Sequence, residues 1–227
     1  AKGLASLVIP NFTNYKLDII EEFKGTKLEG LRYVHPFYDV LKNKYDEIKK
    51  KSKKAFTVVL SKEYVDLSAG TGLVHMAPGC GPEDYEVGHK NDIPPFNTLT
   101  EQGVFDGSIP FLSGLKAKAD DKKLIEELEK KKALIAKTKI EHDYAHCWRC
   151  NNPVIYRATR QWFFKVEDLK ESMLKENNEI KWIPKASFNA FDSWLRNLRD
   201  NSITKQRFWG TPLPVWRCKS CNNFDVL

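Results

Sequence analysis

The sequence predicts an α+β fold in two regions, and three observations lead to this prediction. Residues 56–60 (FTVVL) are apolar and partly β-branched, as strands commonly are. The run KKLIEELEKKKALI, which begins after Asp121, repeats apolar residues at helical spacing and places Leu124 inward. Aromatic residues become dense from residue 141 onward. We therefore expect one region over residues 1–140 and a second over residues 141–227.

The other expected elements follow from shorter patterns. An apolar run at residues 73–76 lies between glycines and Pro78, which predicts a short buried strand. A helix is expected to begin at Pro82, because proline suits the first helical position and the acids after it suit a helix N-terminus. The further candidates are strands at 17–23 and 31–34, a helix at 168–176, and a helix at 188–199 with Phe191, Leu195 and Leu198 on one face.

The segment from residue 70 to residue 88, GTGLVHMAPGCGPEDYEVG, is the most informative part of the chain. Its strand, turn and helix start bring His75 and Asp84 together at one end, which predicts the rim of a small-molecule or aminoacyl-ester pocket. Two plainer interpretations stay open. Asp84 would then be a helix-start acid without a ligand, and His75 a hydrogen-bonded core histidine.

The five cysteines sort by spacing. Cys147 and Cys150 form one C-x-x-C pair, and Cys218 and Cys221 form a second. Two such pairs are typical of a four-cysteine zinc site, which would be structural because four thiolates leave no open position on the ion. Spacing alone leaves a disulfide or unrelated pairs open. Cys80 is left over, and we assign it no chemistry.

Composition excludes several classes of protein. Hydrophobic residues make up 41% of the 227 residues, enough for a core and too many for a disordered chain. No apolar run reaches the length of a membrane span and no signal peptide is recognisable, so no membrane partner is expected. Reduced cysteines indicate a cytoplasmic location. The net charge of +7 is compatible with an RNA partner, although a solvated surface loop is the favoured interpretation of the lysines at residues 49–54.

Four motifs resemble the editing insertion of class I aminoacyl-tRNA synthetases for branched aliphatic amino acids, and the isoleucine enzymes fit best. They occur in the expected order: EEFKGTKLEGLRY from Glu21, GTGLVHMAP from Gly70, HCWRCNNPVIYRATRQWF from His146 and RFWGTPLPVWRC from Arg207. The resemblance implies an editing-type β-barrel core with peripheral helices in residues 1–140, truncated at its N-terminus. It implies a zinc-stapled base in residues 141–227 that connects to the catalytic domain of the same synthetase.

The resemblance also implies a reaction, the hydrolysis of misattached valine from the acceptor end of tRNA(Ile) by a positioned water. Asp84 would hold the α-ammonium group of the substrate, and His75 would form the pocket wall that excludes isoleucine. The turn at Gly70, Thr71 and Gly72 would contribute to substrate binding. The HIGH and KMSKS signatures do not occur here, so ATP would be used only in a catalytic domain outside this chain.

Some positions depart from the pattern of the family. Cys80 stands where relatives often carry histidine, and Asn201, Thr204 and Lys205 replace a tryptophan and a serine–arginine pair, which puts the family's contacts through those side chains in doubt. The threonine-rich wall of the editing site is not found, so we expect weak or no hydrolysis by the chain alone. The alternative functions are a zinc-containing tRNA-binding module and a structural docking module, both without hydrolysis.

Overall fold

The computed structural model describes residues 1–68, 70–203 and 213–226. Its chain divides into two compact units, unit 1 from Ala1 to Ala158 and unit 2 from Thr159 to Leu227. Unit 1 therefore extends beyond the predicted boundary at 140/141. The reason is tertiary: the Ala158 N–H donates to the Gly79 carbonyl at 3.0 Å and Arg157 Nε donates to the Leu99 carbonyl at 2.9 Å, which anchors residues 157–158 on unit 1.

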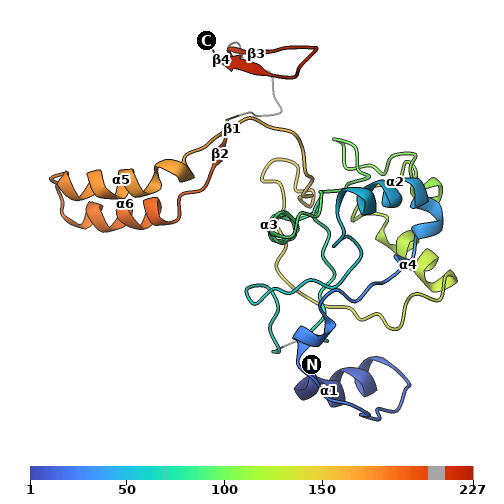
Figure 1. The fold of residues 1–227 in the computed structure, drawn as a ribbon. Coiled ribbons are helices and arrows are strands. Elements are labelled where there is room, and N and C mark those ends of the chain that lie inside the picture. The colour runs from blue at the N-terminus through green and yellow to red at the C-terminus, as the bar shows by residue number, and fades with distance from the viewer. Residues whose placement is uncertain (69, 204–212, 227) are drawn as a thin grey trace. The chain divides into compact units, whose positions relative to one another are not determined.

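Unit 1 is built from helices joined by long irregular segments (Figure 1). A 3₁₀ turn at Gly25–Leu28 precedes α2, and another at Pro110–Leu112 precedes α4. Helix α3 begins at Pro82 as predicted, and α4 begins directly after Asp120 as predicted. The α-helices are α1 (Lys2–Phe12), α2 (Tyr38–Lys51), α3 (Pro82–Lys90) and α4 (Asp121–Lys130).

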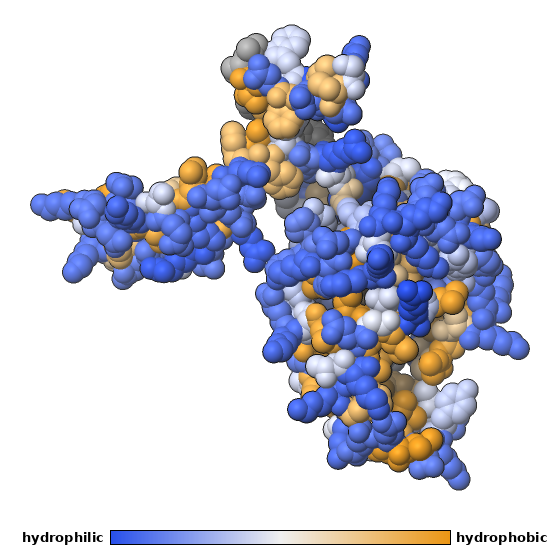
Figure 2. Space-filling view, viewed as in Figure 1, coloured by the Kyte–Doolittle hydropathy of each residue, from blue (hydrophilic) through white to orange (hydrophobic). Residues whose placement is uncertain are grey.

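The core of unit 1 forms where α2 meets the segment before α4. Leu41 and Tyr45 of α2 are buried with Ile109 and Leu112. Leu124 of α4 packs against this cluster, in agreement with its predicted inward position. Ring contacts extend the core, since the Tyr45 ring lies 4.8 Å from that of Phe56 and 5.7 Å from that of Phe96. Hydrophilic side chains cover most of the visible surface of this unit (Figure 2).

In the described residues, none of the runs predicted as strands in unit 1 forms a full strand. Residues 31–34 and 56–60 do pair antiparallel over a short stretch, through the Arg32–Thr57 bridge and the backbone hydrogen bonds beside it. Phe56 has a left-handed φ of 58°, so its run is not extended throughout. The predicted buried strand at 73–76 is irregular and open to solvent, with Leu73 60% and Val74 66% exposed. The editing-type barrel stays a prediction.

Unit 2 consists of short paired elements. Strands β1 (Phe163–Phe164) and β2 (Asn201–Ser202) pair antiparallel, as do β3 (Val215–Arg217) and β4 (Phe224–Val226). A 3₁₀ turn at Glu167–Leu169 leads into α5 (Lys170–Glu179), which pairs with α6 (Ala186–Arg196) as Figure 1 shows. The helices predicted at 168–176 and 188–199 are thus confirmed within a few residues.

The apolar face predicted for the last helix is largely confirmed. Leu195 is fully buried and Leu198, just beyond the end of α6, is 9% exposed, while the Phe191 ring packs 5.2 Å from that of Trp182. Thr204, Lys205 and residues 207–212 of the RFWGTPLPVWRC motif lie outside the described residues. In the part of the chain that the structure describes, no helix has the length and apolar character needed to cross a membrane.

Candidate functional site

The turn before α3 is fixed by close backbone packing. A Cβ atom at Gly79 would lie 2.0 Å from the Phe96 carbonyl oxygen, and one at Gly88 would lie 2.7 Å from the Pro78 ring, so both positions require glycine. Asn97 Nδ2 donates to the Gly79 carbonyl at 2.9 Å. These contacts hold the start of α3 in place relative to the segment that carries His75.

Asp84 lies in the first turn of α3 and folds back over this fixed turn. Its carboxylate is half-buried, and a Cβ atom at Gly81 would lie 2.8 Å from its Oδ2. Burial raises the pKa of Asp84, and a hydrogen bond from the Ala77 backbone and the attraction of His75 lower it in part. Asp84 and His75 are therefore within electrostatic range of each other. His75 is exposed, so it is not the core histidine of the plainer interpretation.

A second histidine, which sequence reasoning missed, belongs to the same neighbourhood. His35 Nδ1 accepts a hydrogen bond from the Phe37 N–H at 3.1 Å and lies 3.3 Å from the Tyr45 hydroxyl. Burial lowers the pKa of His35, and the charge of His75 lowers it further. The neutral imidazole is thus the form that the fold favours, and it links the predicted site to the core.

The predicted substrate-binding turn makes its contacts at the N-terminus of the chain. Gly70 and Gly72 have left-handed φ values of 71° and 83°, and Thr71 Oγ1 accepts a hydrogen bond from the Leu73 N–H. The α-amino group of Ala1 donates to the Thr71 carbonyl. No hydrogen bond or ion pair joins this turn to Asp84 or His75 in the described part of the chain, so its substrate role stays a prediction.

A surface pocket of about 270 Å³ lies at another part of α3. Tyr85 and His89 come from successive turns of α3, and their rings are parallel within 3° with centroids 6.1 Å apart. Neither His75 nor Asp84 lines it. Sequence reasoning missed this pocket, although the i, i+4 spacing of two aromatic side chains and the paired prolines were visible signals. Its lining residues are Lys51, Tyr85, His89, Asp92, Ile93, Pro94 and Pro95.

The lysines at the end of α2 are not in a loop, as the favoured interpretation had them. Lys49, Lys50 and Lys51 form the last turn of this helix, where positive charge suits the helix dipole. The Lys49 ammonium lies 4.3 Å from the centre of the Tyr38 ring. Lys54 donates to Asn91 Oδ1 at 2.9 Å, which ties the end of α2 to the end of α3.

The two cysteine pairs form turns of the same local structure. Each belongs to a C-x-x-C-N-N sequence, and in each the N–H of the first cysteine donates to the carbonyl of the second asparagine, at 2.8 Å for Cys147 and 2.7 Å for Cys218. The first asparagine donates back to the carbonyl of that cysteine and is left-handed, with φ of 55° at Asn151 and 61° at Asn222. The two cysteine pairs thus share one backbone conformation, and C-x-x-C pairs are common zinc ligands.

The thiols are chemically suited to metal binding. Hydrogen bonds from Cys221 and from Ser220 lower the pKa of the Cys218 thiol to about 6. None of the described cysteines forms a disulfide, so the structure gives the disulfide alternative no support. Within either unit, the described residues bring no three His, Cys, Asp or Glu side chains into a metal-binding cluster. The four-thiolate site stays a prediction.

Comparison with known proteins identifies the relatives of this chain. A family profile described as tRNA synthetases class I (I, L, M and V) matches residues 30–226. The isoleucine–tRNA ligase of Methanopyrus kandleri is 40% identical over 211 residues, which are 92% of this chain and 19% of that protein. The Pyrococcus abyssi ligase of the same name is 43% identical over 219 residues, 96% of this chain and 20% of that protein. This chain therefore spans about a fifth of the length of these curated relatives.

Proposed function

We propose that this chain, which belongs to the class I tRNA synthetases (I, L, M and V), is part of an isoleucine–tRNA ligase and carries one wall of its editing site. The reaction at this wall is hydrolysis of valine wrongly attached to tRNA(Ile). Amino-acid activation with ATP belongs to other parts of the complete protein. Its partners are the acceptor end of that tRNA and the catalytic domain of the same synthetase.

The observation that carries the proposal is the placement of Asp84. A half-buried carboxylate with a raised pKa, within electrostatic range of a histidine and on a glycine-fixed turn, attracts a cationic group because it is incompletely solvated. The α-ammonium group of an aminoacyl ester is such a cation. Asp84 therefore holds the substrate, and a water molecule attacks the ester carbonyl.

His75 supplies the size filter of the proposed site. Isoleucine exceeds valine by one methylene group, which supports about 1–3 kcal/mol of discrimination in an apolar pocket, or roughly 10–200-fold. A second site that admits valine and excludes isoleucine multiplies this selectivity. His75 is exposed, so its imidazole is available to a substrate and its bulk limits the room beside the ammonium group.

Deacylation of valyl-tRNA by the complete synthetase tests the role of Asp84. Asp84→Ala should lower the rate at least about thirtyfold, the effect expected for loss of about 2 kcal/mol from a charged partner. Glu83→Ala is the matched control, because Glu83 is the neighbouring exposed acid of the same helix turn. Deacylation by Asp84→Ala at the wild-type rate would contradict the proposal.

A second variant tests the size filter. His75→Ala should allow the synthetase to deacylate isoleucyl-tRNA(Ile), which the wild type spares. Its rate on valyl-tRNA should change less than that of Asp84→Ala, because His75 acts on the side chain of the substrate and Asp84 on its charge. A His75→Ala enzyme that still spares isoleucyl-tRNA would remove His75 from the pocket wall.

Zinc is the cofactor of the proposed structure, with Cys147, Cys150, Cys218 and Cys221 as its ligands. The matching turns of the two C-x-x-C-N-N sequences support this assignment, since each offers a pair of thiols. Four thiolates complete the coordination of the ion, so the zinc stabilises the fold and takes no part in hydrolysis.

A tRNA-binding module without hydrolysis is the second candidate. The lysine-rich end of α2 favours RNA binding, because clustered cations neutralise phosphates. This candidate predicts salt-dependent binding of tRNA and no difference in deacylation between wild type and Asp84→Ala. The same pair of measurements therefore separates the two functions.

A further inference from the structure

The pocket on α3 combines a flat aromatic surface with a cation. Tyr85 is 47% exposed and its ring is parallel to that of His89, so a planar group that stacks on one ring is also parallel to the other. Lys51 lines the same pocket, and in the described part of the chain no ion-pair partner neutralises it. Pro94 and Pro95 add apolar ring faces.

The size and polarity of the pocket limit what it holds. Its volume of about 270 Å³ is below the range of about 300–1,000 Å³ that is usual for small-molecule sites, so it accommodates one planar group and not an extended cofactor. The carboxylate of Asp92 also lines it and accepts hydrogen bonds, which suits a base with exocyclic amino groups. Lys51 suits the phosphate attached to that base.

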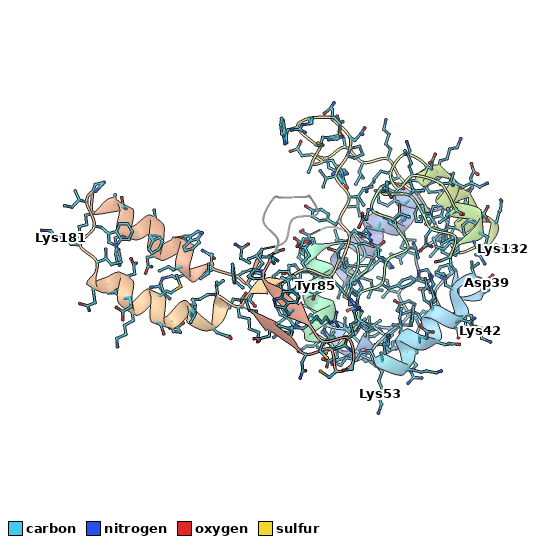
Figure 3. All side chains as sticks on the ribbon, turned by 90° about the horizontal axis from the view of Figure 1, so that it is seen from above. Asp39, Lys42, Lys53, Tyr85, Lys132 and Lys181 are labelled. Carbon is cyan, nitrogen blue, oxygen red and sulfur yellow. The ribbon has the colours of Figure 1, made fainter. Side chains whose placement is uncertain are left out.

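Further lysines flank Lys51 at the end of α2. Lys50 precedes Lys51 at the end of α2, and Lys53 follows it and projects away from the body of the unit (Figure 3). Lys90 of α3, by contrast, is held by Glu86 at 2.7 Å. The available cations thus lead from the pocket along the end of α2, as the backbone of a nucleic acid strand requires.

We propose that this pocket binds one unpaired nucleotide of the tRNA, with its base on Tyr85 and His89 and its phosphate at Lys51. The nucleotide site is separate from Asp84 and His75, which do not line the pocket. The inference rests on tRNA being the partner of the proposed function and does not require hydrolysis. Aromatic stacking suits unpaired nucleotides, because a base in a duplex has no free face.

Binding of tRNA(Ile) transcript to the complete synthetase tests this assignment. Tyr85→Leu removes the flat ring and keeps the apolar bulk, and it should weaken binding about tenfold, whereas Tyr85→Phe should bind like wild type. Lys51→Ala should also weaken binding, and more than Lys42→Ala, which removes a lysine of the same helix outside the pocket (Figure 3). Ultraviolet crosslinking should attach tRNA to the peptide that contains Tyr85.

Two results would overturn the inference. One is wild-type affinity for tRNA in Tyr85→Leu, and if AMP nevertheless binds the pocket, the site belongs to a free nucleotide. The other is equal loss in Lys51→Ala and Lys42→Ala, which would indicate charge alone. Failure of the editing proposal has a different signature, because Asp84→Ala then leaves deacylation unchanged while tRNA binding by Tyr85→Leu is still weakened.

Discussion

Unit 1 and unit 2 keep their structures by different means. Unit 1 packs aromatic rings around Leu41, Tyr45 and Leu112, and it carries His75, Asp84 and the pocket on α3. Unit 2, in the residues described, buries only Leu195, Leu198 and Asn177, and its strands are two or three residues long. Below about 70–80 residues a core rarely supplies more than about 3–5 kcal/mol, so unit 2 needs another source of stability. The comparison shows that the larger core lies in unit 1, with the proposed recognition residues, and that unit 2 is the part for which the proposed zinc would matter most.

Removal of zinc should give the largest change and should affect the two units unequally. Structural zinc contributes about 10–16 kcal/mol of binding free energy in zinc-finger peptides, which exceeds what a small core supplies. We expect a chelator, or Cys218→Ser, to speed hydrogen exchange throughout β3 and β4. The amides of α2 near Leu41 should stay protected, because the core there contains no metal ligand.

Cys80 provides the matched control for that experiment. It is an exposed cysteine outside both C-x-x-C pairs, so Cys80→Ser should retain one zinc per chain by metal analysis. A wild-type chain that is folded and free of metal, with the same exchange at β3 and β4, would refute the dependence of unit 2 on zinc.

Truncation of one leucine in each unit should separate their unfolding. Leu195 and Leu112 are both almost fully buried, at 0% and 1% exposure, so replacing either by alanine should cost about 2–5 kcal/mol. Trp148 is the one tryptophan of unit 1 and is 88% exposed, so tryptophan fluorescence reports mainly on unit 2. Leu195→Ala should lower the urea midpoint seen by fluorescence, whereas Leu112→Ala should lower the one seen by far-ultraviolet circular dichroism. Equal shifts in both signals would mean that the units unfold as one.

Acid should weaken unit 1 through His35. Burial lowers the pKa of His35 below its ordinary value of 6.5, so the unfolded chain binds the proton more readily than the folded chain does. Stability is therefore complete above pH 6.5 and falls as the pH drops below that value toward the lowered pKa. His35→Gln keeps an acceptor without a titrating ring and should lose this part of the pH dependence, measured as urea midpoints between pH 5 and pH 7.5. An unchanged pH profile in His35→Gln would dismiss the residue as the cause.

Surface ion pairs should contribute least in either unit. Asp192 and Arg196 pair at 2.7 Å on the exposed face of α6, and Lys131 pairs with Asp39 at 2.6 Å between the end of α4 and α2. Exposed pairs are screened by salt and gain little net energy. Arg196→Gln should lower the unfolding midpoint barely beyond the precision of a denaturation curve, and about 1 M salt should abolish the difference. A large shift that persists in salt would indicate that this helix face is covered.

Local patterns predicted the helices well and the strands poorly. The start of α3 follows from Pro82 and the acids after it, and α4 follows from its amphipathic repeat, because both depend on neighbours in sequence. Residues 56–60 have the composition of a strand, but Phe56 has a left-handed backbone and packs its ring on Tyr45, and no local pattern contains either feature. Helices α1 and α2 were missed, although Leu41, Tyr45 and Ile48 of α2 have helical spacing.

The candidate site was predictable in part. The strand, turn and helix start expected over residues 70–88 placed His75 near Asp84, and in the structure the charge of His75 acts on Asp84. His35 could not be found, since it joins the site through the fold and not through a nearby motif. The pocket at Tyr85 depends on the end of α2 lying beside the end of α3. The Lys54–Asn91 hydrogen bond shows this arrangement, which no sequence pattern predicts.

The left-handed asparagines of the two cysteine turns have a consequence for mutational tolerance. Asn151 and Asn222 occupy a backbone region that most L-residues enter at a cost of about 1–2 kcal/mol, and that glycine enters freely. A library randomised at these two positions and selected for folded chains should therefore keep asparagine, glycine and aspartate and lose valine and isoleucine. The backbone conformation itself would restrict the tolerated residues in this way, whichever ion or partner binds the neighbouring thiols.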